Sequence, residues 1–248
     1  MVEPAPVVLV HGAWFGGWCW QSVEEALAEF GIRATAVDLP GRPGNPMPIE
    51  KVTLQGWVDH LEHVVSGFAG PCIVVGHSLA GAALTLLGER RPELINRLVY
   101  VAAFLLRAGE SATDVIRRDR NTQVHAARKV ADDFRFSTLE PTSISTILCN
   151  DCPEDAKDAV QANVVPESTI PAQTRVDWTG DRFGTVARTY IVCERDRVID
   201  PSVQRRMIAT VGCDSVRSLD TGHSPFLSLP RGLSQLIAIA AIPSLEPR

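Results

Sequence analysis

Short apolar runs alternate with longer segments whose apolar residues recur every three or four positions. Runs of the first kind, between glycine, proline or polar residues, are typical of buried strands, and the longer spacing is typical of amphipathic helices. Strands are predicted over 7–10, 32–37, 72–75, 95–103, 185–193 and 215–219. Helices are predicted over 18–30, 54–65, 201–211 and 227–242, and from 79 until Pro92 ends the helix. This alternation predicts an α/β fold, a mostly parallel central sheet with helices on both faces.

The alternation breaks in a long central segment, residues 104–182. Residues 107–120 are rich in charge, 124–133 have a helical pattern, and 137–171 mix Ser, Thr and Pro with short helical pieces. So long an excursion between core strands usually forms a lid or a binding insertion. We therefore predict one domain whose core is 1–103 and 183–248, with a mainly helical cap insertion over 104–182.

A tight turn is predicted where the strand 72–75 meets the helix that follows it. The sequence there is Gly76-His77-Ser78-Leu79-Ala80-Gly81. A strand and a helix that nearly touch need small residues two positions before and after the central serine, and Gly76 and Ala80 meet that need. The short motif alone is weak, but its place between a strand and a helix makes it specific. Ser78 is therefore the candidate nucleophile.

A serine hydroxyl needs a base to remove its proton, and the base needs a third group to fix its tautomer. His223 follows the last predicted strand in a glycine-bearing loop, which is the expected place for the base. Four other histidines are interpreted as structural: His60, His63, His77 and His125. His11 stays ambiguous, because its side chain could orient the loop beside it.

The acid of such a site is expected at the end of the strand 185–193. Asp196 is our candidate, because it gives the chain order Ser, Asp, His and leaves room for one helix and one strand before His223. Glu194 and Asp200 remain alternatives. An oxyanion formed at the substrate carbonyl would need two donors. We predict the backbone N–H groups of Leu79, at the helix start, and of Ala13, after the first strand, where Gly12 allows a tight turn.

Composition argues against several kinds of partner. The 248 residues fit one α/β domain, and the 24 Lys and Arg residues are scattered among 29 acidic ones, for a net charge of −5. Nucleic-acid or anionic-membrane binding therefore has no electrostatic support. The longest apolar stretches, such as 98–106, fall well short of the ~20 residues of a membrane helix. The first residues lack a basic segment before their apolar run, so we expect no signal peptide and a cytoplasmic protein.

The cysteines are interpreted as reduced thiols, and not as a metal or redox site. Six are spread along the chain: Cys19, Cys72, Cys149, Cys152, Cys193 and Cys213. Several lie in predicted strands, which favours reduced, buried thiols. Cys149 and Cys152 have the spacing of half a zinc site or a redox pair, but no second pair lies near them in sequence. We expect no metal and no cofactor, a small-molecule partner, and leave a homodimer open.

Three segments together resemble the α/β-hydrolase superfamily. They are residues 11–20 (HGAWFGGWCW), 76–81 (GHSLAG) and 190–196 (YIVCERD). Within the superfamily, the likeness is to the branch of plant methyl-ester esterases, of the methyl salicylate esterase type, and hydroxynitrile lyases, with bacterial relatives. It covers nearly all of the core and only loosely the insertion. The resemblance implies Ser78, Asp196 and His223 as a catalytic triad, with Ala13 and Leu79 as oxyanion donors.

Two departures separate the two activities of that branch. Its lyases carry a threonine where Gly12 stands and a lysine after the catalytic histidine, where this chain has Ser224. Because that lysine stabilises the leaving cyanide, its absence favours a cofactor-free serine esterase that cleaves small apolar or aromatic carboxylic esters. A lyase or decarboxylase on the same fold, or a binding protein with little turnover, are the alternatives. Candidate pocket walls are Trp14, Phe104, Phe134, Phe136, Leu148, Trp178 and Phe226.

Overall fold

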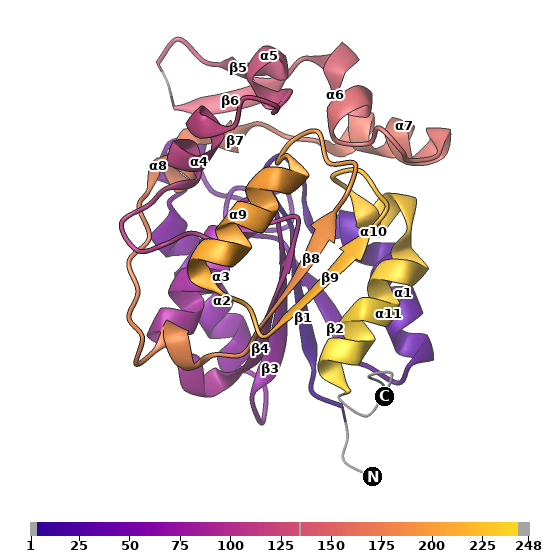
Figure 1. The fold of residues 1–248 in the computed structure, drawn as a ribbon. Coiled ribbons are helices and arrows are strands. Elements are labelled where there is room, and N and C mark those ends of the chain that lie inside the picture. The colour runs from indigo at the N-terminus through magenta and orange to yellow at the C-terminus, as the bar shows by residue number, and fades with distance from the viewer. Residues whose placement is uncertain (1–3, 134, 243–248) are drawn as a thin grey trace.

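A six-stranded, wholly parallel sheet forms the centre of the computed structural model, which describes residues 4–133 and 135–242 (Figure 1). The strand order is β2-β1-β3-β4-β8-β9. The strands are β1 (Val7–Val10), β2 (Ala34–Val37), β3 (Cys72–His77), β4 (Ile95–Val101), β8 (Arg188–Cys193) and β9 (Ser215–Leu219). The predicted parallel sheet is confirmed, and β1 and β9 have the predicted bounds.

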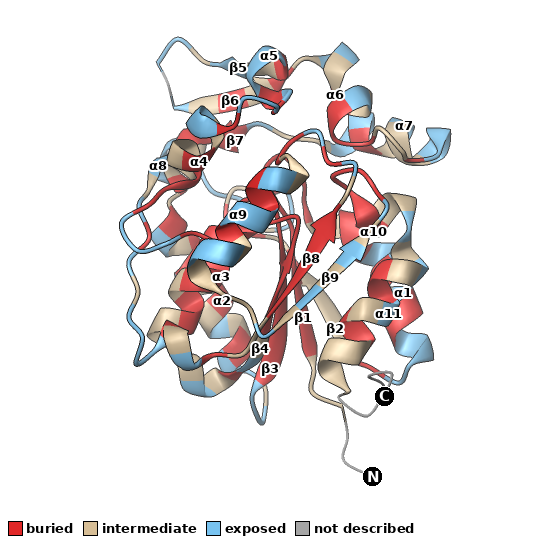
Figure 2. Cartoon of the chain, viewed as in Figure 1, coloured by how far each residue is buried: buried red, intermediate tan, exposed pale blue. Residues whose placement is uncertain are grey.

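Burial falls from the centre of the sheet to its edges (Figure 2). Every residue of β1 and β3 is buried, because helices cover both faces of these central strands. The edge strands β2 and β9 keep partly exposed residues, and in β9 exposed and half-buried positions alternate. The apolar runs of the sequence therefore mark the middle of the sheet most clearly.

Helices cover the two faces in separate groups (Figure 1). α1 (Gln21–Glu29) packs against α11 (Pro230–Ala241) and α10 (Pro225–Ser228) on one face, and α2 (Leu54–Ser66) packs against α3 (Ala80–Arg90) on the other, where α9 (Pro201–Val211) also lies. The predicted helix 18–30 begins as a 3₁₀ turn, Gly17–Trp20, and other 3₁₀ turns are Ile49–Lys51, Pro92–Leu94 and Phe183–Thr185. No helix in the described part of the chain is long and apolar enough to cross a bilayer.

Most of the segment between β4 and β8 lies over the carboxyl ends of the strands, and its last residues run back along the core to the start of β8 (Figure 1). It contains α4 (Ala112–Arg118), α5 (Val124–Ala127), α6 (Pro141–Ile147), α7 (Glu154–Asn163) and α8 (Thr169–Gln173). It also contains a small antiparallel sheet of β5 (Arg128–Val130), β6 (Phe136–Leu139) and β7 (Glu167–Ser168), which the sequence did not predict. The predicted helix 124–133 is confirmed only over α5, because residues 128–130 form β5 and pair with β6, with Arg128 opposite Leu139.

Candidate active site

Ser78 occupies the turn between β3 and α3. Its φ of 53° lies in the left-handed region, which a residue with a side chain adopts at a cost of roughly 1–3 kcal/mol. Backbone bonds hold the turn: the Ser78 amide donates to the carbonyl of Val101 (3.2 Å), and its carbonyl accepts from the amides of Gly81 (3.1 Å) and Phe104 (3.0 Å). The strained turn predicted from the short motif is therefore present, and it places Ser78 at the carboxyl end of a central strand.

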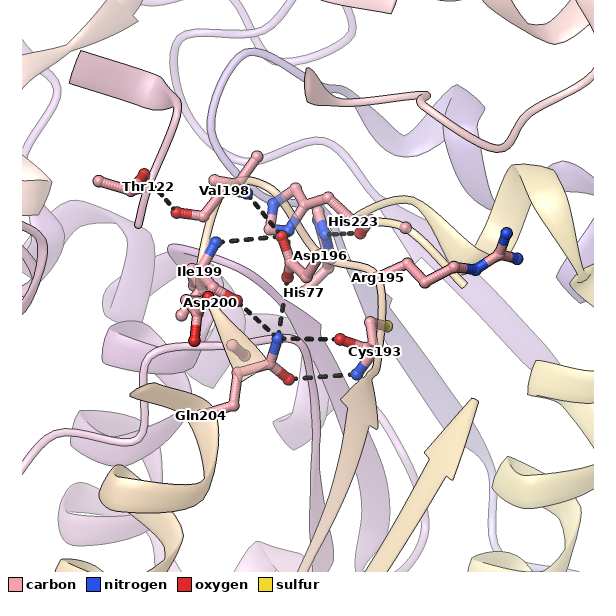
Figure 3. A network of polar contacts seen from close by, with 12 residues as sticks. His77, Thr122, Cys193, Arg195, Asp196, Val198, Ile199, Asp200, Gln204 and His223 are labelled. Carbon is pink, nitrogen blue, oxygen red and sulfur yellow. Dashed lines mark hydrogen bonds and ion pairs between the residues drawn. The ribbon is translucent and has the colours of Figure 1, made fainter. Parts of the chain in front are cut away.

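His223 and Asp196 are joined by a buried hydrogen bond (Figure 3). The imidazole Nδ1–H donates to Asp196 Oδ2 at 2.8 Å, so the Nε2 atom is the one left for proton exchange. The other carboxylate oxygen, Oδ1, accepts from the backbone amides of Val198 (2.7 Å) and Ile199 (3.0 Å). The two alternative acids serve elsewhere: Glu194 pairs with Arg205 at the surface, and Asp200 caps α9.

Gln204 completes the surroundings of this carboxylate and was not predicted. Its side chain is fully buried, and its Nε2 group donates to Asp196 Oδ2 (3.0 Å) and to the carbonyl of Ile199 (2.8 Å). Its Oε1 atom accepts from the Cys193 amide (3.2 Å), which ties α9 to the end of β8 (Figure 3). The sequence does carry one signal for it: Gln204 is a polar residue on the helix face that also buries Val203 and Met207.

His77 supports the loop of His223. The two imidazole rings lie 4.5 Å apart between centroids, and His77 Nε2–H donates to the main-chain carbonyl of His223 at 2.8 Å. Burial holds the pKa of His77 well below its ordinary value, so its ring stays neutral. The side chain next to Ser78 therefore fixes the position of His223 and does not exchange protons with solvent.

His11 fixes the loop that follows β1. The Leu39 amide donates to His11 Nε2 (3.1 Å), so the ring proton lies on Nδ1 and is donated to the Gly12 carbonyl (2.8 Å). Burial lowers the pKa of His11 to about 3, in keeping with this neutral tautomer. Because a peptide unit is planar and trans, holding the Gly12 carbonyl also sets the direction of the Ala13 N–H. The loop-orienting role that the sequence left open is therefore the one the geometry supports.

Two backbone N–H groups beside Ser78 have no acceptor among the described residues: those of Ala13 and Leu79. The loop of Ala13 lies directly against the turn of Ser78, since a Cβ on Gly12 would come within 2.7 Å of both Ser78 Cβ and His77 Nδ1. Unpaired donors next to a serine are what stabilisation of an oxyanion requires. The structure brings together both predicted donors and the predicted serine.

A cavity of about 380 Å³ lies between the core and the cap. Its floor is formed by Ser78, Ala13 and Leu79, and its walls include Trp14, Phe104, Ile116, Val124, Val198 and Ala172. Arg117, His125, Arg128 and Glu167 add charged or polar groups on the cap side. A volume of this size is within the usual range of small-molecule sites.

Two of the candidate pocket walls, Trp14 and Phe104, line this cavity. Trp178 instead packs on Phe183, with ring centroids 5.0 Å apart, and donates its indole N–H to the Leu106 carbonyl. Phe226 is fully buried beneath the site, against Trp20 and His77. Neither lines the cavity, because Phe226 fills a core position and the half-buried Trp178 packs against the core elsewhere. Phe136 and Leu148 are not among its lining residues either, and Phe134 lies outside the described residues.

The cap also contacts the loops that carry the acid and the histidine. Asn150 donates to the carbonyl of Arg195 (3.2 Å), and Asp151 accepts from the amide of Gly222 (2.7 Å). Cys149 and Cys152, which flank these residues, are buried free thiols. Across residues 4–133 and 135–242, no group of three or more His, Cys, Asp or Glu side chains is placed to hold a metal ion.

Comparison with known proteins agrees with this architecture. A model of the alpha/beta hydrolase family matches residues 7–236, and the chain belongs to this family. The chain is 30% identical over 243 residues to a pyrethroid hydrolase of Sphingobium wenxiniae, covering 94% of this chain and 86% of that protein. It is 29% identical over 246 residues to methyl jasmonate esterase 1 of Vitis vinifera, covering 91% and 92%. The crystal structure of a pyrethroid hydrolase from Sphingobium faniae JZ-2 superposes with a TM-score of 0.86 at 25% identity, covering 97% of this chain and 98% of that one.

Proposed function

We propose that this protein is a serine esterase in which Ser78, His223 and Asp196 form the catalytic triad. The observation that carries the proposal is the buried hydrogen bond of 2.8 Å between His223 and Asp196, beside a serine on a strained turn that faces the cavity. A neutral imidazole held in this tautomer by a carboxylate can take a proton at Nε2. The named relatives, a pyrethroid hydrolase and a methyl jasmonate esterase, support ester cleavage.

In the first half-reaction, Ser78 Oγ attacks the ester carbonyl carbon while His223 Nε2 takes its proton. Asp196 stabilises the imidazolium that forms, and Gln204 and two backbone amides keep the carboxylate in place. The carbonyl oxygen becomes an oxyanion that accepts hydrogen bonds from the Ala13 and Leu79 amides. Each such donor is worth roughly 10²- to 10³-fold in rate.

The tetrahedral intermediate then collapses. The bond between the carbonyl carbon and the alcohol oxygen breaks, and His223 gives its proton to the leaving alcohol. A water molecule, deprotonated by His223, attacks the acyl group on Ser78, and the second collapse releases the carboxylic acid and restores the serine. The reaction needs no cofactor.

The proposed substrates are small apolar or aromatic carboxylic esters. The walls beside Ser78 are apolar and include two aromatic rings, Trp14 and Phe104, which favour a substrate of this kind. A cytoplasmic location stays a prediction from the sequence, which leaves a homodimer open.

The test is hydrolysis of 1-naphthyl acetate, p-nitrophenyl butyrate and methyl salicylate by the wild type and by Ser78→Ala. Loss of the nucleophile should lower kcat by roughly 10⁴- to 10⁶-fold. Ser137→Ala is the matched control, because it removes another serine hydroxyl from the same cavity and should leave turnover within a few-fold. Full activity of Ser78→Ala would overturn the proposal. Cleavage of mandelonitrile with no turnover of any ester would favour a lyase.

A further inference from the structure

A buried ion pair lies under the cap, between Arg42 and Glu167. The two side chains are only 1% and 3% exposed. Arg42 belongs to the loop after β2, whereas Glu167 begins β7 of the cap, so the pair joins two segments that are far apart in sequence. Burying two charges costs desolvation free energy that an exposed ion pair does not lose. A buried ion pair is therefore weak evidence of a role in stability. Its position therefore calls for another explanation.

Both ions hold the loop that carries the Ala13 donor. Glu167 Oε2 accepts the backbone N–H of Trp14 at 3.2 Å, and Arg42 Nε donates to the carbonyl of Phe15 at 2.5 Å. The amide of Val165, two residues before Glu167, donates to the Trp14 carbonyl at 3.0 Å. The backbone directly after Ala13 is thus bonded at three polar groups: the N–H and the carbonyl of Trp14, and the carbonyl of Phe15.

The loop needs this support, because Trp14 has a φ of 63°. A residue with a side chain keeps such a conformation only where its surroundings determine it. The peptide before Ala13 is set by His11, through the Gly12 carbonyl, and the peptide after it is set by Glu167, through the Trp14 N–H. The peptide units before and after Ala13 are therefore both held, one by a core residue and the other by a cap residue.

We infer that Arg42 and Glu167 are positioning residues for the oxyanion donor: Arg42 holds the Glu167 carboxylate, and the carboxylate holds the loop so that the Ala13 N–H faces the reacting carbonyl. This inference rests on the proposed function. Because Glu167 belongs to the cap, the cap supplies part of the catalytic geometry as well as walls of the cavity. Neither side chain touches the reacting atoms in this scheme.

The test compares Glu167→Gln with the wild type on p-nitrophenyl butyrate. Glutamine keeps the shape of the side chain and removes the charge that Arg42 holds. We expect kcat to fall roughly 10- to 100-fold with KM within a few-fold, since a misplacement of about 1 Å can cost 100-fold in rate. Glu140→Gln is the matched control, because it breaks the partly exposed cap ion pair with Lys129, neither residue of which lines the cavity, and it should leave kcat unchanged.

A pair of inhibitors separates positioning from substrate contact, which matters because Glu167 also lines the cavity. In 2,2,2-trifluoroacetophenone the carbonyl carbon accepts Ser78 Oγ, the carbon–oxygen π bond opens to an oxyanion, and the serine proton passes to His223. Acetophenone fills the same space without adding the serine. In Glu167→Gln, the inhibition constant of the fluorinated ketone should rise in step with the fall in kcat, while that of acetophenone stays unchanged.

Two results would overturn the inference. An unchanged kcat with a raised KM would make Glu167 a substrate contact only, and unchanged affinity for the fluorinated ketone would make the pair purely structural. If Glu167→Gln fails to fold, Arg42→Lys gives the same test, because lysine keeps the charge but cannot reach Glu167 and Phe15 together. Activity retained in Ser78→Ala would overturn the proposed function, whereas an inactive Ser78→Ala beside an unaffected Glu167→Gln overturns only this inference.

Discussion

The two oxyanion donors are held in different ways. The Leu79 amide lies on a turn that is fixed by backbone bonds to Val101 and Phe104, at the end of the neighbouring strand β4 and just beyond it. The loop of Ala13 is fixed by side chains: His11 beside it, Arg42 from the next loop, and Glu167 from the cap. One donor therefore belongs to the rigid core, and the other depends on the correct placement of three ionisable groups. Substitutions around the site should therefore lower kcat mainly by displacing the Ala13 donor.

Among substitutions that test how the two donors are held, Gly12→Ala should lower kcat the most. Its new Cβ would come within 2.7 Å of Ser78 Cβ, so the loop must move and take the Ala13 N–H with it. Loss of one donor costs roughly 10²- to 10³-fold in kcat. Steady-state kinetics on p-nitrophenyl butyrate measures the loss. Gly70→Ala is the control, because a Cβ there meets nothing within 4 Å. A Gly12→Ala enzyme with wild-type kcat would show that this loop supplies no donor.

Gly81→Ala tests the core-held donor and should mainly cost stability. Its Cβ would lie 2.5 Å from the backbone oxygen of Phe104, which cannot turn aside as a side chain would. Overpacking of this kind costs about 1–3 kcal/mol of unfolding free energy. Urea unfolding followed by circular dichroism measures it, with Gly180→Ala, in open space, as the reference. Equal stability of the two variants would contradict the tight packing of the turn.

The smallest expected effect is the difference in kcat between two substitutions of His11. Both His11→Ala and His11→Asn remove the acceptor of the Leu39 amide, but only asparagine keeps a donor near the place of Nδ1. A hydrogen bond is worth about 0.5–1.5 kcal/mol, so kcat of the alanine variant should be roughly 2- to 12-fold below that of the asparagine variant. Kinetics of the two purified variants at one pH measures the ratio. Equal kcat values would mean that the Gly12 carbonyl needs no such anchor.

The same contrast explains what the sequence could predict. The turn of Ser78 is determined by neighbours in the chain, so a short motif between an apolar run and a helical pattern was enough to place it, and the α/β-hydrolase fold is confirmed. Arg42 and Glu167 could not be found in this way, because each acts through a partner more than a hundred residues distant and stands in a stretch without regular periodicity. Gln204 left only a weak sign, as a polar residue on a buried helix face.

The cap was the least predictable part of the chain. Its strands are two to four residues long, and pairing across the small sheet, as between Arg128 and Leu139, decides their conformation more than local preference does. The same applies to the aromatic residues, because Trp178 and Phe226 have the size and hydrophobicity of pocket walls. Only the packing of their neighbours shows that Phe226 belongs to the core and that Trp178 packs against it.

The missing side chain at Gly12 also bears on the history of such sites. A Cβ at this position would strike both Ser78 and His77. A mutation of Gly12 to a residue with a side chain would therefore lower activity at once if the loop stayed where it is. A lineage that gained a side chain at this position would first need another substitution that moved the loop away from the serine, so the order of substitutions would be constrained.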